Sequence, residues 1–147
     1  MATTIESKGV PTWFWAVAVL ALLWEAMGCW MYVQQMSMSA EAFAALPQAQ
    51  QDVWNQSPGW VPAAYAVAVW SGLAGAVGLL LRKAWCRAFF VLSLLGIVVQ
   101  FGTVFLMTDI LASMGPAQAA GFPIFIFIVG AFLVWFSGLA AKRGWIA

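Results

Sequence analysis

Charged side chains are scarce in this sequence, and their scarcity excludes a soluble globular domain. Only 7% of the 147 residues are charged, whereas 65% are hydrophobic. A soluble domain carries roughly 25% charged residues, because water has to solvate its surface. Lipid is the solvent that suits this composition, and we therefore interpret the chain as an integral membrane protein.

Histidine is absent altogether, which removes several classes of site. Ordinary b-type haem ligation, histidine metal sites and histidine general-base catalysis are all excluded. The chain also contains no CxxC, GxSxG or Walker motif and no recognisable pair of nucleophile and base. We therefore expect a protein that is not an enzyme.

Sulfur-containing side chains remain as candidate metal ligands. They gather in and just after the first apolar run, at Met27, Cys29, Met31, Met36 and Met38. Such soft ligands suit Cu(I), yet methionine also fills irregular gaps in apolar packing. We favour the packing role and expect no cofactor.

Four apolar runs make up most of the chain. A run of about 20 apolar residues crosses the bilayer core as a helix, and continuous runs exclude the alternating pattern of barrel strands. The predicted spans are residues 12–34, 60–81, 88–110 and 123–141. Tryptophans near the predicted span ends, where an amphipathic ring suits the membrane surface, are Trp13, Trp15, Trp60, Trp85 and Trp145. Residues 1–147 are thus predicted to form one domain, an all-α integral membrane four-helix bundle.

The distribution of basic residues predicts how the bundle is oriented. Every Lys and Arg falls in the N-terminal tail, around the loop after the second span, or in the C-terminal tail: Lys8, Arg82, Lys83, Arg87, Lys142 and Arg143. These segments lie on one side of a four-span chain, and the positive-inside rule assigns that side to the cytoplasm. Glu41, Asp52 and Asp109 fall on the other side. We expect both termini to be cytoplasmic.

The connection after the first span is the longest, and it predicts a short amphipathic helix over residues 39–56 of the first outer loop. Ser39 can cap this helix, and Glu41 falls in its first turn, where the helix dipole favours an acid. Pro47 is expected to kink or split it. The residues that give it an apolar face are Phe43, Leu46, Val53 and Trp54. We expect this helix to lie on the membrane surface or to cover the bundle, and we favour this over a binding element.

Small residues at a spacing of four predict close helix contacts. In the second span Ser71 and Gly75 are four apart, and so are Ala74 and Gly78. Because lipid is as apolar as leucine, membrane helices associate through small residues that let their backbones approach. The glycines that we assign to helix packing are Gly28, Gly72, Gly75, Gly78, Gly130 and Gly138. The pattern fits contacts within one chain and contacts between copies equally.

The first span contains an acid, Glu25, within the run LLWEAMGCW. At a rise of about 1.5 Å per residue, counting from the basic loops places Glu25, Gln100 and Ser71 at a similar depth near the midplane. An ionised carboxylate there costs roughly 3 kcal/mol on insertion scales, so the uncharged acid is the expected form. Glu25 then either bonds Gln100 or Ser71 as a polar contact between helices, worth of order 1 kcal/mol, or forms a proton or substrate site. We favour the polar contact, because no second acid and no histidine is present to continue a proton relay.

Four segments carry a resemblance that extends over nearly the whole chain. They read FWAVAVLALLWEAMG, MSAEAFAALPQAQ, GWVPAAYAVAVWSG and LLRKAWCRAFFVLSLLGIVVQ. In these segments the chain resembles a family of small four-span bacterial inner-membrane proteins of unknown function, often loosely labelled sugar transporters. The resemblance implies a multi-pass protein of the bacterial inner membrane. Members usually have Asn where this chain has Glu25. Asn can hydrogen-bond between helices but cannot carry a proton, so the position does not need a proton carrier in those members. The comparison therefore further favours the polar contact as the role of Glu25.

Two functional hypotheses follow from these features. The leading one is a non-enzymatic structural or accessory protein that acts through helix contacts with its own copies, as a homo-oligomer, or with a larger membrane protein complex. The alternative is a small oligomeric transporter or channel for a small solute, a sugar by the family label, with Glu25 and Gln100 near its path. Further candidates for lining that path are Trp24, Trp70 and Trp135. In both cases the expected partners are the lipid bilayer and membrane proteins, not nucleic acid.

Overall fold

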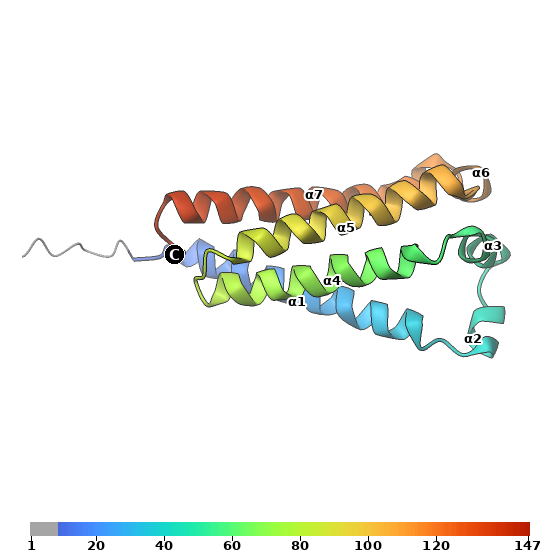
Figure 1. Ribbon diagram of the computed structural model, residues 1–147, viewed down its shortest axis with the longest axis horizontal. Coiled ribbons are helices and arrows are strands. Elements are labelled where there is room, and N and C mark those ends of the chain that lie inside the picture. The colour runs from blue at the N-terminus through green and yellow to red at the C-terminus, as the bar shows by residue number, and fades with distance from the viewer. Residues whose placement is uncertain (1–8) are drawn as a thin grey trace, which may run out of the picture.

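The computed structural model describes residues 9–147, which fold into helices joined by short loops. The helices are α1 (Thr12–Met36), α2 (Ala40–Ala44), α3 (Gln48–Gln56), α4 (Trp60–Leu80), α5 (Cys86–Met107), α6 (Ile110–Met114) and α7 (Pro116–Lys142). Within these residues, four helices are long and apolar enough to cross a membrane: α1, α4, α5 and α7. They lie side by side in one elongated bundle (Figure 1). The predicted all-α four-helix bundle is confirmed, and the chain is a multi-pass membrane protein.

The predicted spans agree with the structure except at the start of the fourth. The first three match α1, α4 and α5 within three residues at each end. The fourth helix, α7, begins at Pro116, seven residues before the predicted start at Pro123. Pro116 occupies the first turn, where its missing N–H leaves no hydrogen bond unmade, and Pro123 lies inside the helix. A transmembrane helix tolerates an internal proline when its neighbours compensate, so the second proline does not mark the start.

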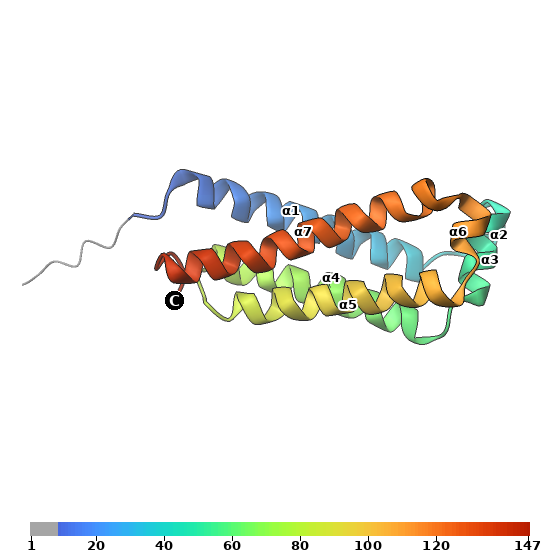
Figure 2. The same ribbon diagram turned by 90° about the horizontal axis from the view of Figure 1, so that it is seen from above.

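The central helix of the bundle is α4. It packs along both α1 and α5, and α5 also packs along α7. The backbones of α1 and α7, which cross in the view of Figure 2, come close at few points. Aromatic side chains bridge them instead: the rings of Trp13 and Phe136 are 5.5 Å apart, and those of Trp24 and Phe125 are 5.4 Å apart. We call this contact between α1 and α7 the aromatic seam.

One close backbone contact joins α4 and α5 at Gly96. A Cβ on Gly96 would lie 2.8 Å from the backbone nitrogen of Ala68 and 3.0 Å from the carbonyl oxygen of Ala64. One turn before Gly96, the hydroxyl of Ser93 donates to the carbonyl oxygen of Ala68 at 2.6 Å. Small residues let the two backbones approach, and the interhelical hydrogen bond fixes their register. Gly96 was not among the glycines that the sequence assigned to packing.

Each of the six glycines assigned to packing from the sequence lies against a neighbouring side chain. An added Cβ would meet Val69 at Gly28, Glu25 at Gly72, Phe90 at Gly75, Trp85 at Gly78, Leu94 at Gly130 and Arg87 at Gly138. All these contacts are made within one chain.

The densest part of the core lies at the end of the bundle that carries the C-terminus and the loop between α4 and α5 (Figure 1). The basic residues of the described chain belong to segments at this end, which we call the basic end; Lys8 lies outside the described residues. Phe14, Phe90 and Phe136 are at most 2% exposed there. Trp145 joins them with 6% of its surface exposed. The tryptophan that was expected at the membrane surface is instead buried, because α7 ends in a turn that directs it inward.

That turn and the residues after it tie the chain to the loop between α4 and α5. Gly144 has φ 73°, a left-handed conformation that ends a helix and that glycine adopts without strain. The N–H of Ala147 donates to the carbonyl of Arg82, and its carbonyl accepts from the N–H of Ala84, both at 3.0 Å. The Arg82 side chain donates through Nε to the carbonyl of Trp145 at 2.7 Å. Residues 145–147 therefore act as a strap across the basic end.

The opposite end of the bundle carries α2, α3 and α6 (Figure 1). Pro47 divides the predicted outer-loop helix into α2 and α3, and Ser39 caps α2 by accepting from the N–H of Ala42 at 3.1 Å. Both local predictions are confirmed. Gln56 of α3 bonds Asp109, accepting from its N–H at 2.8 Å and donating to its carboxylate at 3.3 Å. Helix α3 thus rests against the start of α6.

Candidate ligand-binding cavity

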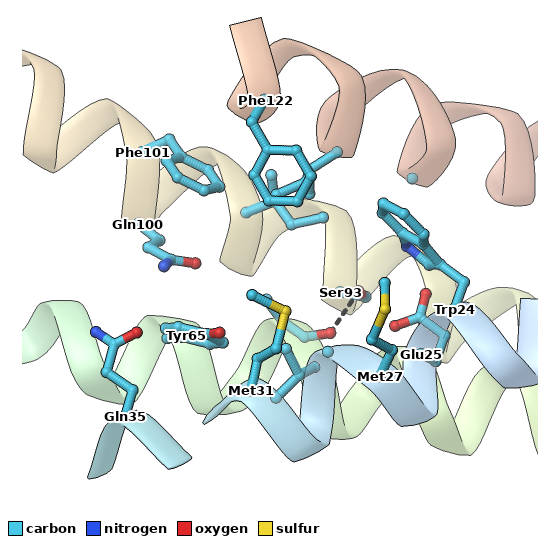
Figure 3. Close-up of a pocket in the computed structure, with 16 residues that line it drawn as sticks. Trp24, Glu25, Met27, Met31, Gln35, Tyr65, Ser93, Gln100, Phe101 and Phe122 are labelled. Atoms are coloured by element: carbon cyan, nitrogen blue, oxygen red, sulfur yellow. Dashed lines mark hydrogen bonds between the residues drawn. The ribbon is translucent and has the colours of Figure 1, made fainter. Parts of the chain in front are cut away.

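The bundle contains a cavity of about 290 Å³ in the half away from the basic end. It lies between the four long helices, and apolar side chains supply most of its wall (Figure 3). The lining residues are Trp24, Glu25, Met27, Gly28, Met31 and Gln35 from α1, Tyr65, Ala68 and Val69 from α4, Ser93, Ile97, Gln100 and Phe101 from α5, and Phe122, Ile126 and Gly130 from α7. Small-molecule sites typically combine apolar walls with a few polar groups in about 300–1,000 Å³. This cavity has that character at the lower limit of size.

Helical spacing directs the polar side chains of two helices toward the cavity. On α1, Glu25 is followed by Gly28, Met31 and Gln35 at intervals of three or four, so they share one face. On α5, Ser93, Ile97 and Gln100 follow one another at intervals of four and three, so Ser93 and Gln100 lie on one face of the helix. The cavity forms where these two faces meet across α4.

Glu25 is buried at the end of the cavity nearer the basic end, with 8% of its surface exposed. Its carboxyl group rests on α4 at Gly72, where a Cβ would overlap with it. Within residues 9–147, the Glu25 side chain makes no hydrogen bond. Every fully enclosed side-chain oxygen or nitrogen in that range does have a hydrogen-bond partner, so the Glu25 oxygens are not fully enclosed. The carboxyl oxygens must therefore reach the cavity. The polar contact between helices that the sequence favoured does not form with either expected partner.

Ser71, the first expected partner of Glu25, does not take part in the cavity. It is buried on α4 beside Gly72, with 8% of its surface exposed, and it is absent from the lining. The serine that lines the cavity is Ser93, whose hydroxyl is engaged with the backbone of α4.

Gln100, the second expected partner, lines the cavity but lies farther from the basic end than Glu25 (Figure 3). Contacts along α4 show the offset, because Glu25 is level with Gly72 whereas Gly96 is level with Ala68. Gln100 follows Gly96 by a further turn in the same direction. The equal depth expected from counting residues is not observed, because the helices start at different levels and cross at an angle.

Three polar lining residues escaped the sequence analysis, namely Gln35, Tyr65 and Ser93. Gln35 and Tyr65 lie beside Gln100 at the end of the cavity away from Glu25 (Figure 3). The signal for Gln35 is its position seven residues, or about two turns, after Gly28 on α1. Tyr65 has no comparable signal, because only the packing of α4 against α1 decides which way it faces. Its ring lies 5.2 Å from that of Tyr32.

Of the three tryptophans considered as path-lining candidates, only Trp24 contributes to the cavity. Trp70 and Trp135 are 45% and 59% exposed on the outside of the bundle. Trp24 also contacts Phe125, so it belongs both to the cavity wall and to the aromatic seam.

The cavity reaches the surface of the bundle between α1 and α7. On the basic side of Trp24, rings of the aromatic seam and the core fill the space between these helices. On the other side of Trp24, no further ring pair joins them in the part of the chain that the structure describes. Lining residues there are themselves exposed, with Met27 at 46%, Met31 at 41% and Phe122 at 54%. A molecule dissolved in lipid therefore meets the cavity from the side.

The chemistry of the wall is acidic, amide, hydroxyl and aromatic, with no basic group among the lining residues. No three His, Cys, Asp or Glu side chains in residues 9–147 come close enough together to hold a metal ion. The arrangement suits recognition of a small molecule by a carboxyl group at one end and amides at the other. Comparison with known protein families, curated proteins and solved structures finds no match to this chain.

Proposed function

We propose that the protein is a non-enzymatic transporter or channel for a small solute, with Glu25 and Gln100 in its binding site. Glu25 carries the proposal, because it is more than nine-tenths buried, faces a cavity and is unbonded within the described residues. A carboxyl group that only joined two helices would be bonded to the neighbouring helix. A group that recognises a ligand keeps its bonding capacity free, and intramembrane acids commonly mark substrate or proton paths.

We also propose that the protein lies in the bacterial inner membrane with its basic end in the cytoplasm; the positive-inside rule and the family resemblance support this. In that orientation the cavity faces the outer half of the bilayer, and the core around Phe14 and Phe136 closes the cytoplasmic half. Transporters that alternate access hold a midplane site open to one side at a time. In the proposed orientation the bundle is closed on the cytoplasmic side of its site, as one stage of such a cycle requires.

Flux measurements in proteoliposomes test this proposal. We would follow uptake of labelled sugars, small cations and protons by the wild type, by Glu25→Gln and by Glu41→Gln, the last removing an exposed acid of α2 as a matched control. We expect uptake of at least one solute class that is lost in Glu25→Gln and kept in Glu41→Gln. Absence of flux for every class, with the protein folded and inserted, would count against a transporter.

A second candidate is the accessory subunit that the sequence favoured, and one observation supports it. The opening between α1 and α7 exposes Met27, Met31 and Phe122, a face on which a helix of another membrane protein could pack. The native mass of the complex, extracted into lipid nanodiscs without harsh detergent, separates the two. A stoichiometric foreign protein would favour the accessory subunit, whereas a closed homo-oligomer would favour the transporter.

A further inference from the structure

We propose that the cavity binds a small lipophilic cation, an amine or quaternary ammonium ion with an apolar or aromatic substituent, in exchange for the proton of Glu25. This inference rests on the proposed function of the cavity as a solute site. It adds the class of solute and the ion to which its binding is coupled.

The charge of the wall selects a cation. Glu25 is the acid in the lining, and the lining contains no lysine or arginine. An anionic solute would therefore lie near a carboxyl group with nothing to compensate its charge. A monovalent cation does the opposite, because it neutralises a carboxylate at a depth where an unpaired charge is costly.

The aromatic side chains of the cavity fit the same class of solute. The ring of Trp24 lies beside the Glu25 carboxyl group (Figure 3), and tryptophan faces attract quaternary ammonium ions most strongly. Phe101 and Phe122 extend the aromatic wall along the cavity. Polarisable thioethers of Met27 and Met31 complete an apolar surface for the substituent.

A sugar fits this wall less well. Apart from Ser93, which is already bonded, the lining side chains that can hydrogen-bond are Trp24, through its indole N–H, and Glu25, Gln35, Tyr65 and Gln100. Three of these lie together at the end away from Glu25 (Figure 3). The rest of the wall is mostly apolar, and sugar hydroxyls left unbonded against an apolar wall weaken binding.

The exchange keeps the site electrically neutral. Without solute, Glu25 is a carboxylic acid and the site carries no charge. When the cation enters, the O–H bond of Glu25 breaks, its electron pair stays on the carboxylate, and the proton leaves to water. The carboxylate then pairs with the cation, so the charge is again zero. The titratable group next to Glu25 is Cys29 on the same helix, α1; Tyr65 of α4 lies at the other end of the cavity, and α5 and α7 bring no titratable group into the lining.

Access for such a solute is provided from the side. Lipophilic cations concentrate in the membrane interface, and the cavity reaches the bundle surface between α1 and α7, beyond Trp24. A volume of about 290 Å³ admits a compact ion with one aromatic ring and excludes a two-chain lipid.

Calorimetric binding of benzyltrimethylammonium to the full chain in nanodiscs of zwitterionic lipid tests the proposal. While free Glu25 is protonated, we expect the affinity to rise about tenfold per pH unit, with one proton released per cation into weak buffer. Glu25→Gln should weaken binding at least about 30-fold, as removal of one partner from a buried charge pair does, and should abolish proton release. Glu41→Gln should change neither. Neopentylbenzene, the uncharged isostere, should compete poorly with the cation.

Several results would overturn the proposal: binding of the cation without proton release, equal competition by neopentylbenzene, or unchanged binding in Glu25→Gln. If Glu25→Gln does not fold, Glu25→Asp keeps the exchange testable, because it must retain proton release with weaker affinity. Cation binding with proton release but without flux would keep this inference and refute transport. Flux of a neutral solute without cation binding would do the reverse.

Discussion

Replacing Gly96 by alanine tests the close contact between the backbones of α4 and α5. The added methyl group would lie 2.8 Å from the backbone nitrogen of Ala68 and 3.0 Å from the carbonyl oxygen of Ala64. These are backbone atoms of α4, which cannot rotate away as a side chain can. The two helices would have to separate by several tenths of an ångström, which also stretches the bond that Ser93 makes to α4.

Three terms set the expected change in the free energy of unfolding. Overpacking a well-packed interface costs about 1–3 kcal/mol, and weakening the Ser93 bond costs up to about 0.6 kcal/mol. Alanine regains about 1 kcal/mol over glycine in a helix. We therefore expect Gly96→Ala to lower the unfolding free energy by about 0–2.6 kcal/mol, with the middle of that range at about 1.3 kcal/mol.

Gly102 provides the matched control, because it lies on the same helix and a Cβ there would meet nothing within 4 Å. Gly102→Ala should leave stability unchanged or raise it by up to about 1 kcal/mol. Equilibrium unfolding in mixed micelles, with increasing mole fraction of dodecyl sulfate and far-ultraviolet circular dichroism as readout, measures both variants. If Gly96→Ala proved as stable as Gly102→Ala, the description of the α4–α5 contact would be wrong.

Three further tests address other contacts with the same unfolding assay. Trp145→Ala should lower the unfolding free energy by about 3–5 kcal/mol, as for other large aromatic side chains in a core. Trp135→Ala, at a residue that is 59% exposed, should change it by no more than about 0.5 kcal/mol. Equal effects of the two substitutions would argue against the buried strap. Ser93→Ala should cost about 0.6 kcal/mol for its interhelical bond, and no loss would mean that the bond contributes nothing. Gly72→Ala should lower the stability of the wild type more than it lowers the stability of the Glu25→Ala variant, with a coupling free energy of at least about 0.5 kcal/mol. Additive effects would mean that Gly72 and Glu25 are not in contact.

The sequence predicted what depends on composition and on local chemistry. Four apolar runs in a chain with few charges determine the class of fold and the number of spans. The cap at Ser39 and the break at Pro47 follow from interactions within one turn of the chain. The start of the fourth helix was misplaced because two prolines, Pro116 and Pro123, each satisfied the local rule.

The cavity was only partly predictable, because its shape depends on tilt and depth. Glu25 was identified by its charge, and Gln100 by its place in an apolar run, but their separation depends on the levels at which α1 and α5 meet α4. Gly96 was missed because its small neighbour, Ser93, is three positions away, and the search used a spacing of four. The inward turn of Trp145 is a contact between distant parts of the chain, which no local pattern encodes.

The pairing of Trp13 with Trp145, whose rings lie 5.1 Å apart, also dictates an order of events during synthesis. About 130 residues separate the two tryptophans, so at ribosomal speeds the second emerges on the order of ten seconds after the first. Throughout that interval the aromatic side chains of α1 lack their partners on α7 and at Trp145, whereas α4 and α5 can pair as soon as both have been made, through contacts near in sequence. The aromatic seam therefore closes last, and a nascent chain arrested before α7 would present those rings to lipid or to whatever factor shields unfinished membrane proteins.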